Sequence, residues 1–155
     1  YGIRLKRAKP PIAFGKPVKQ GDIILTESPA EKADLMKRCV AVGGQTVELR
    51  DKTLFIDGIA EKPAPGVKHA DPDTISYKDL GKKRDTMPLR TVPPDSMFLM
   101  GDNRDFSLDS RLLGPRPENE VIGKAVMILW SLDPKVSWSQ PWKKFRSGRW
   151  FKKII

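Results

Sequence analysis

The chain has 155 residues, of which 39% are hydrophobic and 31% charged, a balance typical of one globular domain with at most a small appendage. Its formal net charge of +10 indicates attraction to an anionic partner such as nucleic acid, a lipid surface or an acidic protein. The single cysteine, Cys39, excludes an internal disulfide. The single histidine, His69, lies far from Cys39 in sequence, which argues against a zinc site.

The first residues are basic and contain Pro10, Pro11 and Pro17, so we expect an extended or looped segment over residues 1–20. The sequence contains neither a signal peptide nor an apolar run long enough to span a membrane. The chain as given is therefore expected to be soluble. It opens on Tyr1 without a methionine, so we also expect it to be a fragment.

Short apolar runs separated by turn-forming residues predict the next strands. They cover residues 23–26, 35–42, 46–49 and 53–56. The last two runs are close enough to form a hairpin, and Asp57-Gly58 predicts a further turn into Ile59.

The stretch 61–89 is polar, contains prolines and is longer than an ordinary loop. We interpret it as an insertion or small second lobe, with 1–60 and 90–155 forming the core. Beyond it, the apolar runs 96–100 and 121–130 predict two more strands. These elements together predict a mainly β, antiparallel fold with little helix.

A charged loop from Gly101 to Arg111 lies between the last two predicted strands and contains three aspartates, two arginines and two serines. Polar turn residues are common on protein surfaces, so a solvated loop is the simpler interpretation. The alternation of acids and arginines favours local pairing instead, because paired charges are tolerated near a core. Such a rigid loop could support a catalytic group from behind.

Lys37 and Arg38 are neighbours on a predicted strand, so their side chains point to opposite faces. If Arg38 faces the charged loop, Lys37 has Leu35 and Cys39 as its same-face neighbours. An amine that has lost hydration gives up its proton more readily and can serve as a general base for a serine hydroxyl. Alternatively, both cations reach solvent, as most lysines do.

The loop Gly-Asp-Asn-Arg-Asp-x-Ser-x-Asp-Ser-Arg, with Met36-Lys37-Arg38 and Gly21-Asp22-Ile23-Ile24 before it, resembles type I signal peptidase. The similarity continues through Leu113-Gly114-Pro115 and Val121 to Ala125, and so covers nearly the whole chain. It implies a signal-peptidase-like antiparallel β fold. It also implies a membrane-bound serine endopeptidase that uses a Ser/Lys dyad to remove signal peptides from secreted preproteins.

Residue by residue, the resemblance implies that Lys37 is the general base and that Ser107 orients its amine. Arg38 with Asp102, and Asp109 with Arg111, would form supporting ion pairs. The strand segment Asp34, Leu35 and Met36 would bind the substrate by strand addition, with Leu35 and Met36 helping to wall shallow pockets for small residues. No metal or cofactor is implied.

The family's nucleophilic serine belongs to a Ser-Met-x-Pro segment upstream of the region that matches Tyr1. No such segment occurs among the 155 residues. We therefore expect this chain to contain the base without the nucleophile and to be inactive by itself, with the membrane anchor and part of the oxyanion hole also missing. Gly43-Gly44-Gln45 replaces the family's usual Pro-Gly-Asp turn, which does not affect the chemistry.

The segment 142–155 interleaves aromatic residues with six cations and contains no acid. This composition suits a lipid interface, and it is also compatible with a basic terminal segment that has no partner. None of the compact nucleic-acid motifs is present, so no nucleic-acid partner is expected. The resemblance places the domain at the extracytoplasmic face of the cell membrane, periplasmic or outer.

Two other interpretations remain open. The chain could come from a related Ser/Lys processing protease, although a self-cleaving regulator would lack the charged loop and usually carries a DNA-binding domain. It could also be a non-catalytic member that binds peptides or a membrane without cutting.

Overall fold

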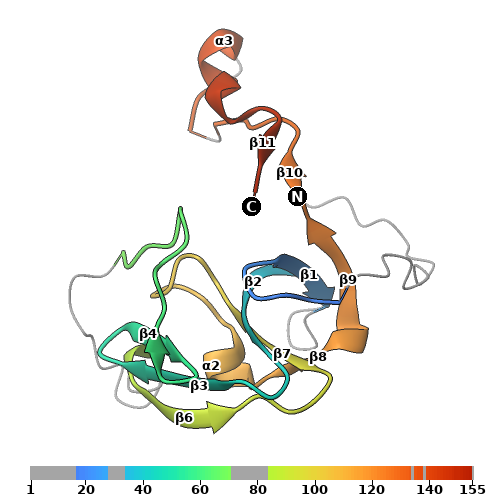
Figure 1. Ribbon diagram of the computed structural model, residues 1–155. Helices are drawn as coiled ribbons and strands as arrows, with labels where there is room; N and C mark the ends of the chain where they lie inside the picture. Colours follow the sequence, from blue (N-terminus) through green and yellow to red (C-terminus); the bar gives the residue numbers. More distant parts are fainter. Residues whose placement is uncertain (1–16, 28–33, 71–83, 134, 138, 155) are drawn as a thin grey trace. The chain divides into compact units, whose positions relative to one another are not determined.

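A computed structural model describes residues 17–27, 34–70, 84–133, 135–137 and 139–154 (Figure 1). The chain divides into two compact units, Tyr1–Lys124 and Ala125–Ile155. In the described part, no helix has both the length and the apolar character needed to cross a bilayer. The prediction of a mainly antiparallel β fold with little helix is confirmed, since the paired strands of the described part run antiparallel.

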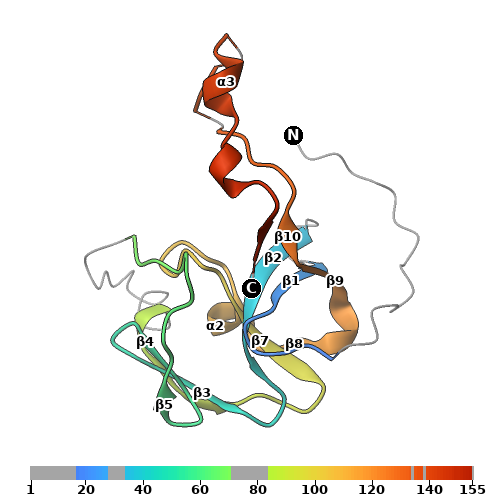
Figure 2. The same cartoon turned by 45° about the horizontal axis from the view of Figure 1, so that its top comes forward.

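The first unit contains a five-stranded sheet with strand order β8-β7-β2-β1-β9. Its strands are β1 (Ile23–Glu27), β2 (Asp34–Val42), β7 (Ser96–Met100), β8 (Arg116–Pro117) and β9 (Val121–Ala125). Figures 1 and 2 both show β1, β2 and β7 side by side, with the central β2 the longest. A bulge between Cys39 and Ala41 adjusts the register of β2 against β7.

A four-stranded sheet has the order β5-β4-β3-β6. Its strands are β3 (Thr46–Arg50), β4 (Thr53–Ile56), β5 (Ile59–Ala60) and β6 (Met87–Thr91). The predicted hairpin of β3 and β4 is present, with Val47 opposite Ile56. Asp57 and Gly58 both have positive φ, as a two-residue hairpin turn of type I′ requires, and they lead into β5 as expected.

Two apolar clusters form the core. The larger combines residues of both sheets: Val40, Ala41, Val47, Leu49, Leu54, Ile56, Met87, Val92, Phe98 and Met100. The smaller contains Val18, Ile24, Cys39, Met97 and Leu99. Because side chains alternate along a strand, Lys37 belongs to the face of Cys39 and Leu99, and Arg38 to the face of Met100.

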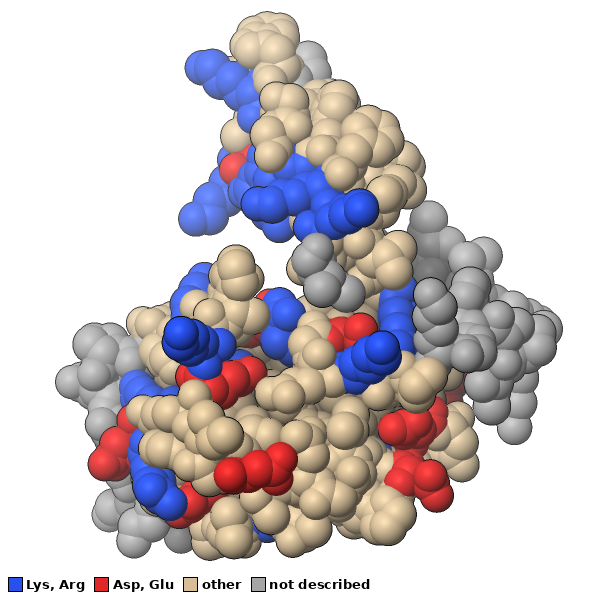
Figure 3. All heavy atoms as spheres, viewed as in Figure 1, with Lys and Arg blue, Asp and Glu red and all other residues tan. Residues whose placement is uncertain are grey.

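Short helical segments complete the described part: α2 (Ser110–Leu113), η1 (Glu118–Glu120), α3 (Pro141–Lys144) and η2 (Ser147–Arg149). The Ala125–Ile155 unit also contains a ladder of β10 (Met127–Ile128) with β11 (Lys152–Lys153). On the face shown in Figure 3, lysine and arginine side chains gather over this unit.

Two sequence-based expectations differ from the structure. The apolar run 121–130 was expected to form one strand, but it forms β9 and β10, with a break at Val126. Hydrophobicity alone does not register such a break. The charged loop does not run to Arg111 as a loop, because α2 begins at Ser110 with Asp109 as its N-cap. The assignment of 61–89 to a separate lobe stays a prediction; residues 71–83 lie outside the described part, and Met87 begins β6.

Candidate active site

Lys37 and Ser107 meet where β2 passes the charged loop. The Lys37 Nζ atom donates a hydrogen bond of 2.8 Å to Ser107 Oγ across 70 positions of sequence. Lys37 is half-buried. Ser107 comes from the turn between β7 and α2, so the contact depends on the pairing of β2 with β7.

Gly101 leaves the space that Ser107 occupies. A Cβ atom at this position would lie 2.2 Å from Ser107 Oγ, 2.6 Å from Ser107 Cβ and 3.6 Å from Lys37 Nζ. The first two distances are far below contact distance. Glycine at this position is therefore required by space, not by backbone conformation, since Gly101 is absent from the positive-φ positions.

Arg38 binds the start of the loop with two parallel hydrogen bonds, Nε to Asp102 Oδ1 at 2.8 Å and Nη2 to Asp102 Oδ2 at 2.9 Å. Its Nη1 atom donates to the carbonyl of Gly21 at 3.1 Å, which ties the loop to the turn before β1. The hydrogen bond to Asp102 raises the pKa of the Arg38 guanidinium although burial opposes this. The loop is thereby fixed to β2 next to Lys37.

Asp109 and Arg111 form the most buried ion pair of the site, with side chains 0% and 2% exposed. Two guanidinium nitrogens of Arg111 each donate to Asp109 at 2.9 Å, and the Gly101 amide donates to Asp109 at 3.0 Å. The Ser107 hydroxyl also acts to lower the pKa of the Asp109 carboxyl. Burial acts to raise the pKa of the Asp109 carboxyl, but Arg111 and the other donors together hold it below its ordinary value.

A segment following β5 runs along the loop and was not expected there. The Lys68 amide donates to the carbonyl of Asp102 at 2.9 Å, and the Arg104 amide donates to the carbonyl of Lys68 at 3.0 Å. His69 Nδ1 lies 3.3 Å from the buried carboxylate of Asp105. His69 is thus next to the charged loop, although it is distant from the loop in sequence.

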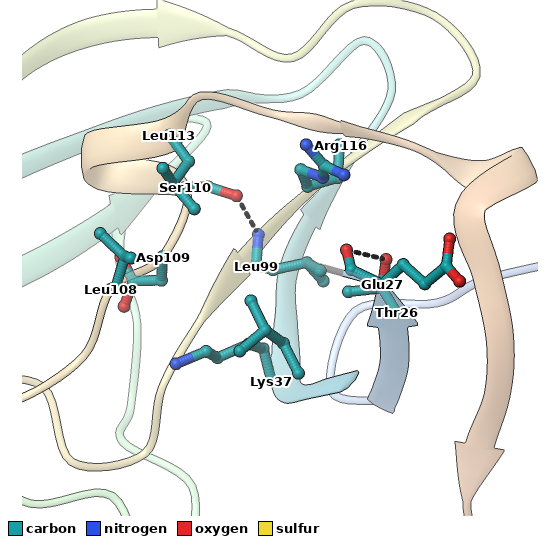
Figure 4. Close-up of a pocket in the computed structure, with 10 residues that line it drawn as sticks. Thr26, Glu27, Lys37, Leu99, Leu108, Asp109, Ser110, Leu113 and Arg116 are labelled. Carbon is teal, nitrogen blue, oxygen red and sulfur yellow. Dashed lines mark hydrogen bonds between the residues drawn. The ribbon is translucent and has the colours of Figure 1, made fainter. Parts of the chain in front are cut away.

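A pocket lies beside Lys37 on the face of the sheet that carries Leu99 (Figure 4). Its lining comprises Thr26, Glu27, Leu35, Lys37, Leu99, Leu108, Asp109, Ser110, Leu113 and Arg116. In Figure 4, Lys37 extends from β2 toward the loop with Leu108 and Asp109, while Glu27 and Arg116 lie at the other end. Ser110 supports the pocket by accepting a hydrogen bond of 2.9 Å from the Leu99 amide.

The residues expected to bind substrate lie at the start of β2. Leu35 lines the pocket, Met36 is 59% exposed, and Asp34 is also exposed. β1 pairs with β2 along Asp34–Arg38, whereas β7 pairs with β2 only from Arg38 onward. Over the described residues, β7 therefore leaves one side of the first half of β2 uncovered.

No group of His, Cys, Asp or Glu suited to a metal ion occurs among the described residues. Cys39 is fully buried, and burial raises the pKa of its thiol to about 12, so it stays protonated near neutral pH. The side chains brought together around the loop are thus one amine, several hydroxyls and buried ion pairs.

Comparison with known proteins identifies a family. The family described as signal peptidase, peptidase S26, matches residues 5–130. Signal peptidase I of Mycobacterium tuberculosis strain H37Rv is 40% identical over 117 residues, covering 66% of this chain and 38% of that protein. Signal peptidase I of Pseudomonas aeruginosa PAO1 is 34% identical over 167 residues, covering 88% of this chain and 58% of that protein.

A solved structure is similar too. The crystal structure of a signal peptidase I from Enterococcus faecalis V583 matches with a TM-score of 0.53 and 29% identity, covering 71% of this chain and 97% of that one. The chain spans between 38% and 64% of the length of the curated relatives that it matches.

Proposed function

The chain belongs to the signal peptidase family, peptidase S26, and from this premise we propose that it is the catalytic part of a serine endopeptidase that removes signal peptides from secreted preproteins. The observation that supports the proposal most directly is the 2.8 Å hydrogen bond between Lys37 Nζ and Ser107 Oγ. It fixes an amine at the mouth of a pocket, and the nearby loop acids Asp102 and Asp109 are engaged by arginines.

Lys37 is proposed to act as the general base of a Ser/Lys dyad. In its neutral form, the amine takes the proton of the attacking serine hydroxyl, while the serine oxygen bonds to the scissile carbonyl carbon. The resulting ammonium then gives this proton to the leaving amine as the peptide bond breaks. In the second half of the reaction, Lys37 takes a proton from water as the water oxygen bonds to the acyl carbon, and it returns this proton to the serine oxygen as the ester bond breaks.

Ser107 is proposed to orient Lys37 and not to be the nucleophile. Its hydroxyl accepts the hydrogen bond of Lys37, which suits a group that orients the amine. We infer that the nucleophilic serine is outside the 155 residues, because the Ser96-Met97 pair is followed by Phe98-Leu99 and no Ser-Met-x-Pro segment occurs.

The substrate is proposed to add as an extended strand along the first half of β2. That half has β1 on one side, and β7 does not cover the other. Strand addition satisfies backbone groups first and presents alternate side chains to pockets. Leu35 and Met36 lie on opposite faces of β2 and would wall shallow pockets for the small residues one and three before the cut.

The unit Ala125–Ile155 is proposed to contact the lipid surface on the extracytoplasmic side of the cell membrane. Five of its aromatic residues are exposed: Trp130, Trp142, Phe145, Trp150 and Phe151. The unit has seven lysines and arginines against one acid. Exposed rings among cations suit the boundary between headgroups and acyl chains.

A peptide with Ala-x-Ala before the scissile bond tests the proposed activity in the complete gene product. Lys37→Arg is expected to lower kcat by roughly 10²–10⁴-fold, the usual contribution of a general base, because a guanidinium keeps its proton. The exposed Lys62→Arg is the matched control and should be fully active.

Retention of most of the activity in Lys37→Arg would remove Lys37 from the mechanism. The 155 residues alone are expected to leave the peptide uncut. Steady turnover by this chain that Lys37→Ala abolishes would show that the nucleophile lies within it.

A further inference from the structure

A further buried ion pair joins Glu61 to Arg104 of the charged loop and lies outside the contacts that hold Lys37 directly. Glu61 follows β5, and its amide donates to the carbonyl of Leu54 at 2.8 Å. Its Oε2 atom lies 3.6 Å from Arg104 Nη2, a separation of ion-pair length and not of a hydrogen bond. The two side chains are 15% and 4% exposed, so their charges are poorly hydrated.

Arg104 depends strongly on this carboxylate. Among the described residues, its buried Nε and Nη2 atoms have no hydrogen-bond partner, and its Nη1 atom reaches only the sulfur of Met100 at 3.9 Å. Burial lowers the pKa of the Arg104 guanidinium, with Glu61 as the strongest opposing charge. Removal of the anion would leave a buried cation without its ion-pair partner, an arrangement that drives a side chain to move.

Arg104 is also connected to the amine of Lys37 by a continuous series of contacts. Its carbonyl accepts a hydrogen bond of 2.5 Å from Arg111 Nη2. Arg111 holds Asp109, which accepts from the Gly101 amide. Ser107 packs directly over Gly101 and accepts from Lys37. A shift of Arg104 therefore reaches Ser107 through groups that have little freedom to adapt.

We propose that ionised Glu61 is a positioning residue for the reaction, because it holds Arg104 and thereby keeps Ser107 aligned with Lys37. As a statement about catalysis, this inference rests on the proposed function. As a statement about geometry, it concerns the distance between Ser107 and Lys37 and can be tested without any activity.

A purely stabilising role does not explain Glu61. Burial raises the pKa of its carboxyl despite the opposing effects of Arg104 and Arg38. For a carboxyl with a raised folded pKa, the contribution to stability is present below the ordinary value of about 4.3 and is lost as pH rises through the folded value. Glu61→Gln also leaves Arg104 without its ion-pair partner and is therefore expected to lower the Tm, so kcat is measured well below the Tm of the variant.

The catalytic test uses Glu61→Gln in the complete gene product. The expected result, at a temperature well below the Tm of the variant, is a kcat lower by about tenfold, within the 10²-fold that a misplacement of 1 Å can cause, with KM within twofold. Glu48→Gln is the matched control, because Glu48 pairs with Arg50 on the surface of the same unit. Its kcat should be unchanged.

A double-mutant cycle shows whether Glu61 acts through Arg104. Arg104→Met and the double variant Glu61→Gln/Arg104→Met are expected to lower kcat by the same factor, because the second substitution removes nothing further once the pair is broken. If the kcat of the double variant fell by the product of the two single factors, Glu61 would act by another route, and the proposal would be overturned.

A crystal structure of the 155-residue Glu61→Gln chain gives the geometric result. We expect Arg104 to be displaced and the Ser107 Oγ to Lys37 Nζ distance to exceed hydrogen-bond length, against 2.8 Å with Glu61 in place. An unchanged distance or an unchanged kcat would each reject the positioning role. Failure of the proposed function appears differently, as an active Lys37→Arg protein, and leaves this distance measurement valid.

Discussion

The site requires that Gly101 has no side chain. Ser107 packs so closely over this glycine that its hydroxyl occupies the position of a Cβ substituent. The backbone at Gly101 is not in the left-handed region, so any residue could adopt it if space were available. The constraint comes entirely from a residue six positions later, and it could not be deduced from the residue type alone.

Gly101→Ala is expected to displace Ser107 from Lys37 and to lower kcat by roughly 10²-fold in the complete gene product, as a misplacement of about 1 Å can. Gly123→Ala is the matched control, since a Cβ there meets nothing within 4 Å. Steady-state kinetics and Tm should be measured for both. Wild-type activity in Gly101→Ala would mean that Ser107 does not need its observed position.

Cys39 provides a second test at the level of one residue. Its thiol is fully buried, and its pKa of about 12 leaves almost no thiolate at pH 8, the form that reacts with iodoacetamide. The folded chain should therefore remain unlabelled, while the chain in guanidinium chloride should be labelled rapidly, as measured by mass spectrometry. Rapid labelling of the folded chain would contradict the burial of β2 at this point.

At the level of elements, β2, β7 and the loop between β7 and α2 hold one another through charges as well as backbone pairing. Arg38 connects β2 to the loop, while Arg111 connects α2 to the loop and to the carbonyl of Arg84. In the Arg38–Asp102 and Arg111–Asp109 pairs, the guanidinium lies at hydrogen-bond distance from the carboxylate. Loss of one partner is costly because the remaining charge is stranded.

Asp109→Ala is expected to lower the free energy of unfolding by about 3–5 kcal/mol, which corresponds to a fall in Tm of roughly 10 °C for a chain of this size. Glu48→Ala, at an exposed ion pair, should change the Tm far less. Thermal unfolding followed by circular dichroism compares the two. Similar Tm values would show that the Asp109 pair contributes no more than a surface pair.

The Asp109 carboxylate also makes the stability of the protein depend on pH. Because the pKa of Asp109 is lowered in the folded protein, its contribution to stability is present above the ordinary value of about 3.9 and is lost as pH falls through the lowered value. The difference in Tm between the unaltered protein and Asp109→Ala should therefore shrink below about pH 4.

Much of the arrangement of these strands and ion pairs was predictable from the sequence. Strand alternation placed Lys37 and Arg38 on opposite faces, and the structure finds Arg38 on Asp102 and Lys37 on Ser107. The pairing of Asp109 with Arg111 was also expected and is found, whereas the catalytic roles of these residues stay predictions. α2 could have been anticipated from Asp109 as an N-cap and Gly114 after the last helical residue.

Other parts of the site had no sequence signal. Glu61 and His69 lie in a polar stretch whose composition fits any exposed loop, and their positions beside Arg104 and Asp105 follow only from tertiary packing. The contact between Lys68 and the loop is made by backbone groups, which every residue carries. Residue types and periodicity do not report such long-range backbone pairing.

For the molecule as a whole, positive charge and exposed aromatic surface coincide in the Ala125–Ile155 unit. All four tryptophans of the chain lie between residues 130 and 150. Tryptophan emission therefore reports on this unit alone, which gives a direct optical test of the proposed contact with lipid.

Vesicles that contain anionic lipid are expected to bind the 155-residue chain more strongly than neutral vesicles, with a blue shift of tryptophan emission and weaker binding at high salt. The double variant Trp142→Ser/Phe151→Ser should bind less to both kinds of vesicle, since each ring is 71% exposed. Ile59→Ser, at an exposed apolar residue of the other unit, is the control and should bind normally. Equal binding by all three proteins would place lipid contact elsewhere.

The separation in sequence between Lys37 and its partners has a consequence for biosynthesis. Lys37 and Ser107 are 70 positions apart, and Arg38 and Asp102 are 64 apart, so β2 is translated well before the loop that completes the site. At about 5–20 residues per second, a nascent chain carries Lys37 for several seconds without Ser107 or the ion pairs that would align its amine. The contact between Lys37 and Ser107 therefore forms only after the ribosome has passed Arg111, so an unfinished polypeptide does not present the assembled site to its neighbours.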